Sequence, residues 1–116
     1  ITANRDLFIS AVSNVFDNAI KYSKGPALIS VAVIEEPTKR VRIEIKDDGI
    51  GLSRKETRKI FRRFYRGGSK IARQQTGTGL GLYFSKIALT AMGGDISVTS
   101  EGLGRGCTFR IEIPKA

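Results

Sequence analysis

The 116-residue sequence predicts an α+β fold, a two-layer α/β sandwich with helices on one face of a mixed, mostly antiparallel sheet. Two observations predict it. Segments with apolar residues at three- and four-residue spacing alternate with pairs of β-branched segments, and the chain is long enough for one compact domain but too short for two. We expect about five strands, about three helices and a single domain over residues 1–116.

The first half of the chain predicts a helix and a hairpin. Residues 6–24 predict a helix that ends at Gly25-Pro26. Residues 28–34 and 41–47 are β-branched and alternating, so they predict two antiparallel strands with a turn near residues 36–40. The expected apolar stripe of the helix is Phe8, Ala11, Val12, Val15, Phe16, Ala19 and Ile20.

The second half repeats this order after a loop. Residues 54–60 predict a short helix, and residues 66–79, which contain few core-forming side chains, predict a long mobile loop. Residues 80–92 predict a helix, followed by strands over 95–100 and 107–113 around the turn GLGRG. The expected core face of this second helix is Leu80, Phe84, Ile87, Ala88 and Ala91.

Composition excludes several classes of function. The chain has no histidine, which excludes Ser-His-Asp and Cys-His catalysis, and one cysteine, Cys107, which we expect to pack in a strand. No stretch is long and apolar enough to span a membrane, and the N-terminus does not resemble a signal peptide. The net charge of +9 is concentrated in residues 54–73, where nine basic residues and one acidic residue give +8.

Three polar side chains share one stripe of the first helix. Asn14, Asn18 and Lys21 fall within an arc of about 60° at 3.6 residues per turn. Carboxamide oxygens suit Mg²⁺, which keeps waters and phosphates as its other ligands, and a lysine can neutralise phosphate charge. A solvated polar stripe is the alternative interpretation, because such stripes are common on amphipathic helices.

Two glycine-rich segments are candidates for a ligand site. In DDGIG, Asp47 follows a strand and can accept a hydrogen bond from an exocyclic amine such as that of adenine, although Asp-Gly is also a common turn. The segment GTGLGL, residues 77–82, opens the second long helix, where free amides favour phosphate. A flexible hinge is the alternative, and the segment is not a Walker A loop.

The basic segment contains interleaved aromatic and arginine residues, IFRRFYR at residues 60–66. Such a pattern can stack on bases and contact phosphates. Equally, Phe61 and Phe64 can dock the start of a loop onto the core while the arginines stay in water.

In this order and spacing, the four motifs resemble the ATP-binding catalytic domain of bacterial sensor histidine kinases, whose Bergerat fold also occurs in gyrase B, Hsp90 and MutL. NVFDNAIKYS is similar to the N box of that family, DDGIG to its G1 box, IFRRFYR to its F box and GTGLGL to its G2 box. The resemblance covers the whole chain and implies a long mobile ATP lid over about residues 54–78.

The resemblance also implies roles for individual residues. Asn18 would coordinate Mg²⁺, Asp47 would bind the adenine amine and Arg66 would approach the γ-phosphate. The glycines of DDGIG would make room for the ring. The catalytic residues would be Asn14, Asn18, Lys21 and Arg66. The nucleotide contacts would be Asn14, Asn18, Lys21, Tyr22, Asp47, Gly49, Ile50, Gly51, Thr76, Gly77, Thr78, Gly79, Leu80, Gly81 and Leu82.

The function implied by the resemblance is transfer of the γ-phosphoryl of Mg-ATP to a histidine. Because the chain has no histidine, the acceptor would lie on a separate dimerisation domain of the same kinase, and the phosphoryl group would pass to the receiver domain of a response regulator. Asn14 stands where the hydrolysing members of the superfamily carry a glutamate, so we expect negligible ATPase activity. We expect a monomeric, cytoplasmic fragment of a membrane-associated, homodimeric sensor kinase, without membrane or nucleic-acid contacts of its own.

Three other functions stay open at the level of sequence. A serine kinase of the anti-sigma-factor type shares the fold but should keep the glutamate that Asn14 replaces. A basic nucleic-acid-binding module would account for the charge of +9. A non-catalytic ATP-binding module is the third alternative.

Overall fold

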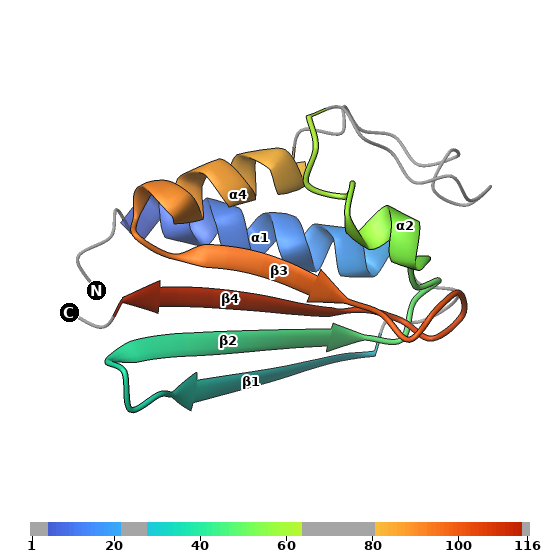
Figure 1. Cartoon of the computed structure of the whole chain (residues 1–116), viewed down its shortest axis with the longest axis horizontal. Helices are drawn as coiled ribbons and strands as arrows, with labels where there is room; N and C mark the ends of the chain where they lie inside the picture. Colours follow the sequence, from blue (N-terminus) through green and yellow to red (C-terminus); the bar gives the residue numbers. More distant parts are fainter. Residues whose placement is uncertain (1–4, 22–27, 64–80, 115–116) are drawn as a thin grey trace.

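The structure is a computed structural model that describes residues 5–21, 28–63 and 81–114, and these residues form two layers (Figure 1). One layer is a sheet of four antiparallel strands in the order β1-β2-β4-β3, and α1 and α4 cover one of its faces. The elements are α1 (Arg5–Lys21), β1 (Ile29–Glu35), β2 (Arg40–Asp47), α2 (Arg54–Thr57), α4 (Gly81–Ala91), β3 (Asp95–Thr99) and β4 (Thr108–Pro114).

The predicted α+β sandwich is therefore confirmed, with two corrections. The described part of the chain contains four strands where about five were expected, and all three pairings between them are antiparallel, so no parallel pair makes the sheet mixed. The hairpin turn lies where it was predicted: the Glu36 amide donates to the Arg40 carbonyl at 2.9 Å, and Lys39 adopts a positive φ of 61°.

The core lies between the sheet and the two long helices. Strand β4 is central, and its alternate residues Phe109, Ile111 and Ile113 are buried against the helices. The buried residues of α1 follow at four-residue intervals, Ala11, Val15 and Ala19. The prediction that Ile20 joins this stripe is wrong, because its side chain is 58% exposed.

Of the core face predicted for α4, Ala88 is confirmed, Phe84, Ile87 and Ala91 are wrong because they are exposed, and Leu80 lies outside the described residues. Phe84 and Ile87 are 37% and 49% exposed, and the buried residues are Leu82, Ser85, Ala88 and Leu89. The helix is apolar almost all round, so spacing alone does not define one face. On the buried side, the Ser85 hydroxyl lies within hydrogen-bond distance of the Ala11 and Gly81 carbonyls.

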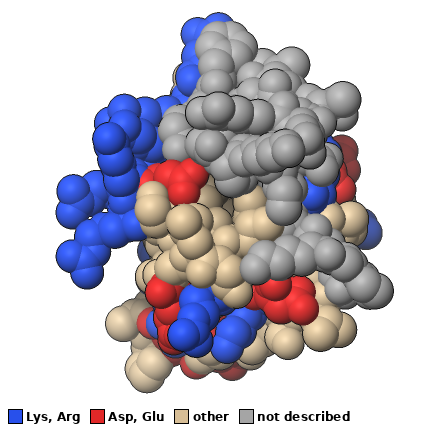
Figure 2. All heavy atoms as spheres, turned by 90° about the vertical axis from the view of Figure 1, so that its right-hand side faces the viewer, with Lys and Arg blue, Asp and Glu red and all other residues tan. Residues whose placement is uncertain are grey.

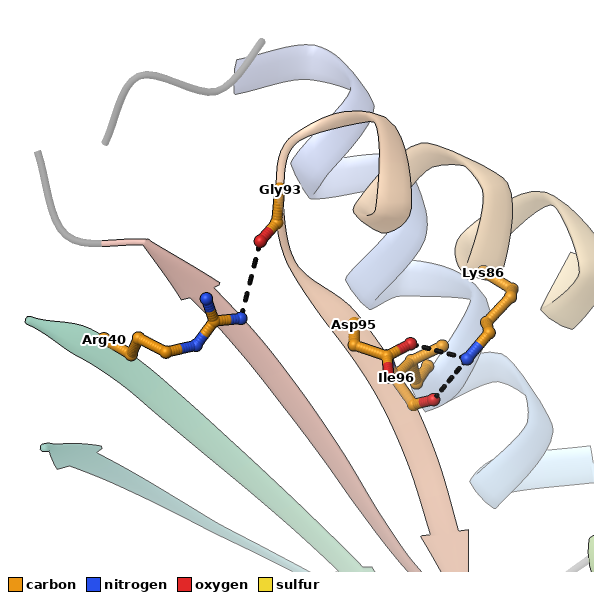
Figure 3. A network of polar contacts seen from close by, with 5 residues as sticks. All are labelled: Arg40, Lys86, Gly93, Asp95 and Ile96. Atoms are coloured by element: carbon orange, nitrogen blue, oxygen red, sulfur yellow. Dashed lines mark hydrogen bonds and ion pairs between the residues drawn. The ribbon is translucent and has the colours of Figure 1, made fainter. Parts of the chain in front are cut away.

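Polar contacts fasten the connection between α4 and β3 (Figure 3). The Lys86 ammonium donates to Asp95 Oδ1 at 2.5 Å and to the Ile96 carbonyl at 3.3 Å, and Arg40 Nη2 donates to the Gly93 carbonyl at 3.4 Å. Burial alone would raise the pKa of Asp95, but the hydrogen bonds from Lys86 and from the Ile96 amide outweigh it, so its pKa lies below the usual value. The contacts fix the helix against the sheet edge.

Candidate functional site

Three of the four predicted motifs meet at one end of the sandwich. Helix α1 and strand β2 end there and α4 begins there (Figure 1). Asn18 and Lys21 lie in the last turn of α1, Asp47 is the last residue of β2, and Gly81 is the first of α4. The fold thus brings amide, carboxylate and glycine residues that are far apart in sequence to the same end.

The first and third motifs are in direct contact. A Cβ placed on Gly81 would lie 3.5 Å from Asn14 Oδ1, so the side chain of Asn14 packs against the start of α4. One turn further along α4, the buried Ser85 hydroxyl lies 2.9 Å from the Ala11 carbonyl and 3.1 Å from the Gly81 carbonyl. Sequence reasoning missed Ser85, although a serine in an otherwise apolar helix was a visible signal.

The Asn18 side chain is oriented by its own helix. Its Nδ2 donates to the Asn14 carbonyl at 2.9 Å, and its Oδ1 has no hydrogen bond within the described residues. An amide oxygen held in this way is a hard neutral ligand that fits Mg²⁺, which needs few protein ligands when phosphates and waters supply the rest. No cluster of three His, Cys, Asp or Glu side chains occurs in the described ranges to offer a second kind of metal site.

Asp47 is a buried carboxylate with one oxygen already bonded. Asp47 is only 9% exposed. Its Oδ1 accepts hydrogen bonds from the Gly49 amide at 2.9 Å and from the Cys107 amide at 3.3 Å. Burial raises the pKa of Asp47, the two amides lower it, and Asp48 adds to the rise, so the pKa lies above the usual value. Oδ2 makes no hydrogen bond in the described part of the chain and can accept one from a ligand.

The glycines near Asp47 serve close backbone packing. Gly51 has a φ of +70°, and a Cβ there would lie 2.2 Å from the Gly102 carbonyl oxygen. A Cβ on Gly106 would lie 2.0 Å from the Asp47 carbonyl oxygen. The space at Gly51, expected to accommodate a ligand ring, is therefore filled by the β3–β4 turn, a part of this site that sequence reasoning missed.

Cys107 lies beside Asp47, just before β4, and is packed against the core. Burial and the nearby Asp47 carboxylate raise the pKa of its thiol to about 12. The thiol is therefore protonated at neutral pH and is a poor nucleophile.

The start of the basic segment is docked onto the core. Ser53 and Glu56 form a capping box that begins α2. Phe61 meets Phe109 edge to face, with ring centroids 6.2 Å apart, and Lys86 lies 5.8 Å from the Phe61 ring centre. The docking interpretation of Phe61 is thus confirmed. Residues 54–63 of the expected lid belong to the described part, and its Phe61 is anchored to the sheet side of the core.

The charged side chains of this docked segment point outward. Figure 2, which looks at the site end of the molecule, shows Lys and Arg side chains gathered along one side of this end. The exposed basic residues of the segment are Arg54, Lys55, Arg58, Arg62 and Arg63.

Several predicted site residues lie outside the described ranges, namely Tyr22, Arg66, Thr76, Gly77, Thr78, Gly79 and Leu80. Phe64 lies outside them as well. Of the described ones, Gly49 and Ile50 contribute backbone groups to the packing around Asp47. The Leu82 side chain belongs to the hydrophobic core, so it is not available to a ligand.

Comparison with known proteins identifies the family. The family model described as "Histidine kinase-, DNA gyrase B-, and HSP90-like ATPase" matches residues 3–116. The chain belongs to this family. Within the histidine kinase-, gyrase B- and HSP90-like ATPases, its curated relatives and structural neighbours are sensor histidine kinases.

Two curated relatives illustrate the similarity. Sensor protein GacS of Pseudomonas syringae pv. syringae is 37% identical over 109 residues, which is 90% of this chain and 12% of the relative. Sensor protein SrrB of Staphylococcus aureus (strain MRSA252) is 36% identical over 114 residues, which is 98% of this chain and 19% of the relative. The chain therefore spans less than a fifth of either protein.

Solved structures of histidine kinases share the fold. The mycobacterial sensor histidine kinase MprB superimposes with a TM-score of 0.88 at 29% identity, covering 98% of this chain and 76% of that chain. Full-length ShkA, solved in complex with AMPPNP, superimposes with a TM-score of 0.79 at 29% identity, covering 95% of this chain and 22% of that chain. The chain thus shares the fold of these domains as well as the family.

No helix among the described residues combines the length and the apolar character needed to cross a membrane.

Proposed function

We propose that this chain is the catalytic domain of a two-component sensor histidine kinase, which binds Mg-ATP and phosphorylates a histidine on a dimerisation domain of the same kinase. The observation that carries the proposal is the Asp47 carboxylate, which is buried, bonded through Oδ1 to two amides and without a hydrogen bond at Oδ2 among the described residues. Such an oxygen accepts a hydrogen bond from the exocyclic amine of adenine, which an oxygen exposed to water would do with less selectivity.

The rest of the nucleotide would follow from Asp47 towards the two helices. The Asn18 Oδ1 would hold Mg²⁺ beside the phosphates, with Asn14 behind it, and the exposed Lys21 would neutralise phosphate charge. Bound Mg²⁺ would supply positive charge that neutralises charge on the phosphates. We assign further contacts to Tyr22, Arg66 and residues 76–82, and we assign the ATP lid to about residues 54–78.

The chemistry that this site can support is positioning and charge neutralisation. A neutral imidazole nitrogen of the acceptor attacks the γ-phosphorus, a P–N bond forms, the bond to the β–γ bridging oxygen breaks, and ADP leaves with that electron pair. The imidazole then loses its N–H proton to solvent. No general base is required, and Asn14, a carboxamide, is not one. The phosphoryl group would pass to a response regulator.

The adenine assignment is tested by calorimetry with Mg-ATP. Asp47→Asn removes the negative acceptor but keeps the size and the Oδ1 contacts, so we expect ATP affinity to fall by about a hundredfold, as for a lost hydrogen bond to a charged group. Asp48→Asn, the same change at the exposed neighbour, should bind like the wild type. Equal affinities of wild type and Asp47→Asn would contradict the assignment.

Phosphoryl transfer is tested by adding a histidine-bearing dimerisation domain from the same kinase. We expect no autophosphorylation of this chain alone, an acid-labile phosphohistidine on the added domain, and negligible release of free phosphate. An acid-stable phosphoserine on a partner would instead identify a serine kinase. ATP-resistant, salt-dependent DNA binding would favour the nucleic-acid module. We place the reaction in the cytoplasm, where ATP is available.

A further inference from the structure

The β3–β4 turn, residues 100–107, is bonded to the loop that follows β2. The Gly104 amide donates to the Ile50 carbonyl at 2.7 Å, and the Gly106 amide donates to the Gly49 carbonyl at 3.1 Å. Both loops lie at the site end of the molecule (Figure 1). The β3–β4 turn is therefore packed against the loop that contains Gly49 and Ile50, next to Asp47.

One hydroxyl joins these two loops. Ser100 Oγ accepts from the Leu52 amide at 3.1 Å and from the Gly102 amide at 3.2 Å. Ser100 Oγ donates its hydrogen to the Gly106 carbonyl oxygen at 2.7 Å. The Gly102 carbonyl oxygen, at 3.3 Å, is a more distant acceptor for the same hydrogen. A serine hydroxyl offers one donor and two acceptor positions, so all of them are used.

The position of the turn fixes the bond to the carboxylate. Cys107, whose amide donates to Asp47 Oδ1 at 3.3 Å, directly follows Gly106, whose carbonyl Ser100 holds. Gly106 is packed so closely on the Asp47 backbone that no side chain would fit between them. A shift of the turn would therefore move the Cys107 amide relative to the carboxylate.

We propose that Ser100 is a positioning residue for the adenine-binding carboxylate: its hydroxyl holds the β3–β4 turn so that Oδ1 of Asp47 is occupied by backbone amides and Oδ2 is directed at the ligand. This inference rests on the proposed function, because it assumes that Asp47 binds adenine. The proposal predicts that loss of the Ser100 hydroxyl weakens binding of nucleotides that carry the exocyclic amine more than binding of nucleotides that lack it. A general loss of stability would not produce this difference.

The test compares ATP with inosine triphosphate, which lacks the exocyclic amine, in wild type and in Ser100→Ala. We expect Ser100→Ala to lower ATP affinity by about tenfold, as for one lost hydrogen bond or an unpaired amide, and to lower affinity for inosine triphosphate much less. Ser100→Thr, which keeps the hydroxyl, should restore the preference for ATP. Ser97→Ala, the same change at an exposed position of β3, should bind like the wild type.

Two results would overturn the proposal: wild-type affinity for ATP in folded Ser100→Ala, or an equal loss for both nucleotides, which would indicate a structural role only. If Ser100→Ala does not fold, Ser100→Cys, with a weaker donor of similar shape, should show an intermediate loss of ATP preference, and an unchanged preference would count against the proposal.

Hydrogen exchange without nucleotide separates this inference from the proposed function. We expect Ser100→Ala to speed exchange at the amides of Leu52, Gly102 and Gly106, and Ser97→Ala to leave them unchanged. Unchanged exchange in Ser100→Ala would overturn the positioning role even if the wild type binds ATP. If the wild type does not bind ATP, but Ser100→Ala speeds exchange at these amides as expected, the proposed function would be overturned instead.

Discussion

At the scale of single residues, Asp47 shows a conflict between stability and ligand binding. Its carboxylate is buried, and the two amides that bond to Oδ1 do not fully offset the lost hydration, so its pKa is raised. A carboxyl group with a raised pKa in the folded state favours folding when protonated, and this contribution is lost as the pH rises through the folded-state pKa. The ionised form, which would bind adenine best under the proposed function, is therefore the less stable one.

Replacing this carboxylate should stabilise the protein while it removes function. We expect Asp47→Asn to melt a few degrees above the wild type at about pH 7, with the difference shrinking to nothing below about pH 4, where both side chains are neutral. Thermal denaturation across that pH range without nucleotide measures it. Asp17→Asn, at an exposed position of α1, is the control, and a wild type more stable than Asp47→Asn at neutral pH would refute the argument.

The sequence indicated the residues whose chemistry is local. Asp47 at a strand end and Asn18 beside an apolar stripe have recognisable types and spacing, and their positions at one end of the molecule agree with the prediction. The roles of Gly51, Ser85 and Ser100 depend on carbonyl groups of segments distant in sequence or on the packing of a turn. No local pattern reports such contacts, so the partners of these residues could not be predicted from the sequence.

At the scale of elements, periodicity worked where a segment has one polar and one apolar side. The apolar stripe of α1 predicted its buried face, apart from the exposed Ile20. It failed for α4, where apolar residues surround the helix and a hydrogen-bonded serine is buried while Phe84 is exposed. A buried hydroxyl with two carbonyl neighbours overrides a hydropathy pattern.

The docking of the basic segment depends on Phe61. Truncating this half-buried ring should remove the contact with Phe109 and cost about 2 kcal/mol of unfolding free energy, less than for a fully buried phenylalanine. Urea denaturation of Phe61→Ala measures the loss. Arg62→Ala, a neighbouring exposed position, should change stability by less than about 0.5 kcal/mol, and equal effects of the two variants would contradict docking through the ring.

At the scale of the whole molecule, the nucleotide would bridge layers that are otherwise held by the core. Strand β2 supplies Asp47, while α1 and α4 supply the amides and the glycine. A ligand that binds only the folded state stabilises it by mass action, by about 2.7 kcal/mol at a hundred times its Kd.

Mg-ATP should therefore raise the melting temperature by several degrees at saturating concentration. Chelating the metal with EDTA should reduce the shift, because the phosphates would then lack the cation that Asn18 is placed to share. Asp47→Asn should show almost no shift with either form of ATP. A shift that is indifferent to EDTA would remove the case for a magnesium ligand in α1.

The Ser85 hydroxyl ties α1 to α4, whereas Asp47 belongs to the sheet and to the loops around it. Under the proposed function, the site would therefore have two halves that are stabilised separately, one for the triphosphate and one for the base. Adenosine should bind weakly to the half for the base, and inorganic triphosphate should bind weakly to the half for the triphosphate. In ATP the two fragments are covalently joined, so the translational and rotational entropy of binding is lost once instead of twice. ATP should therefore bind more tightly than the separate affinities of the two fragments suggest.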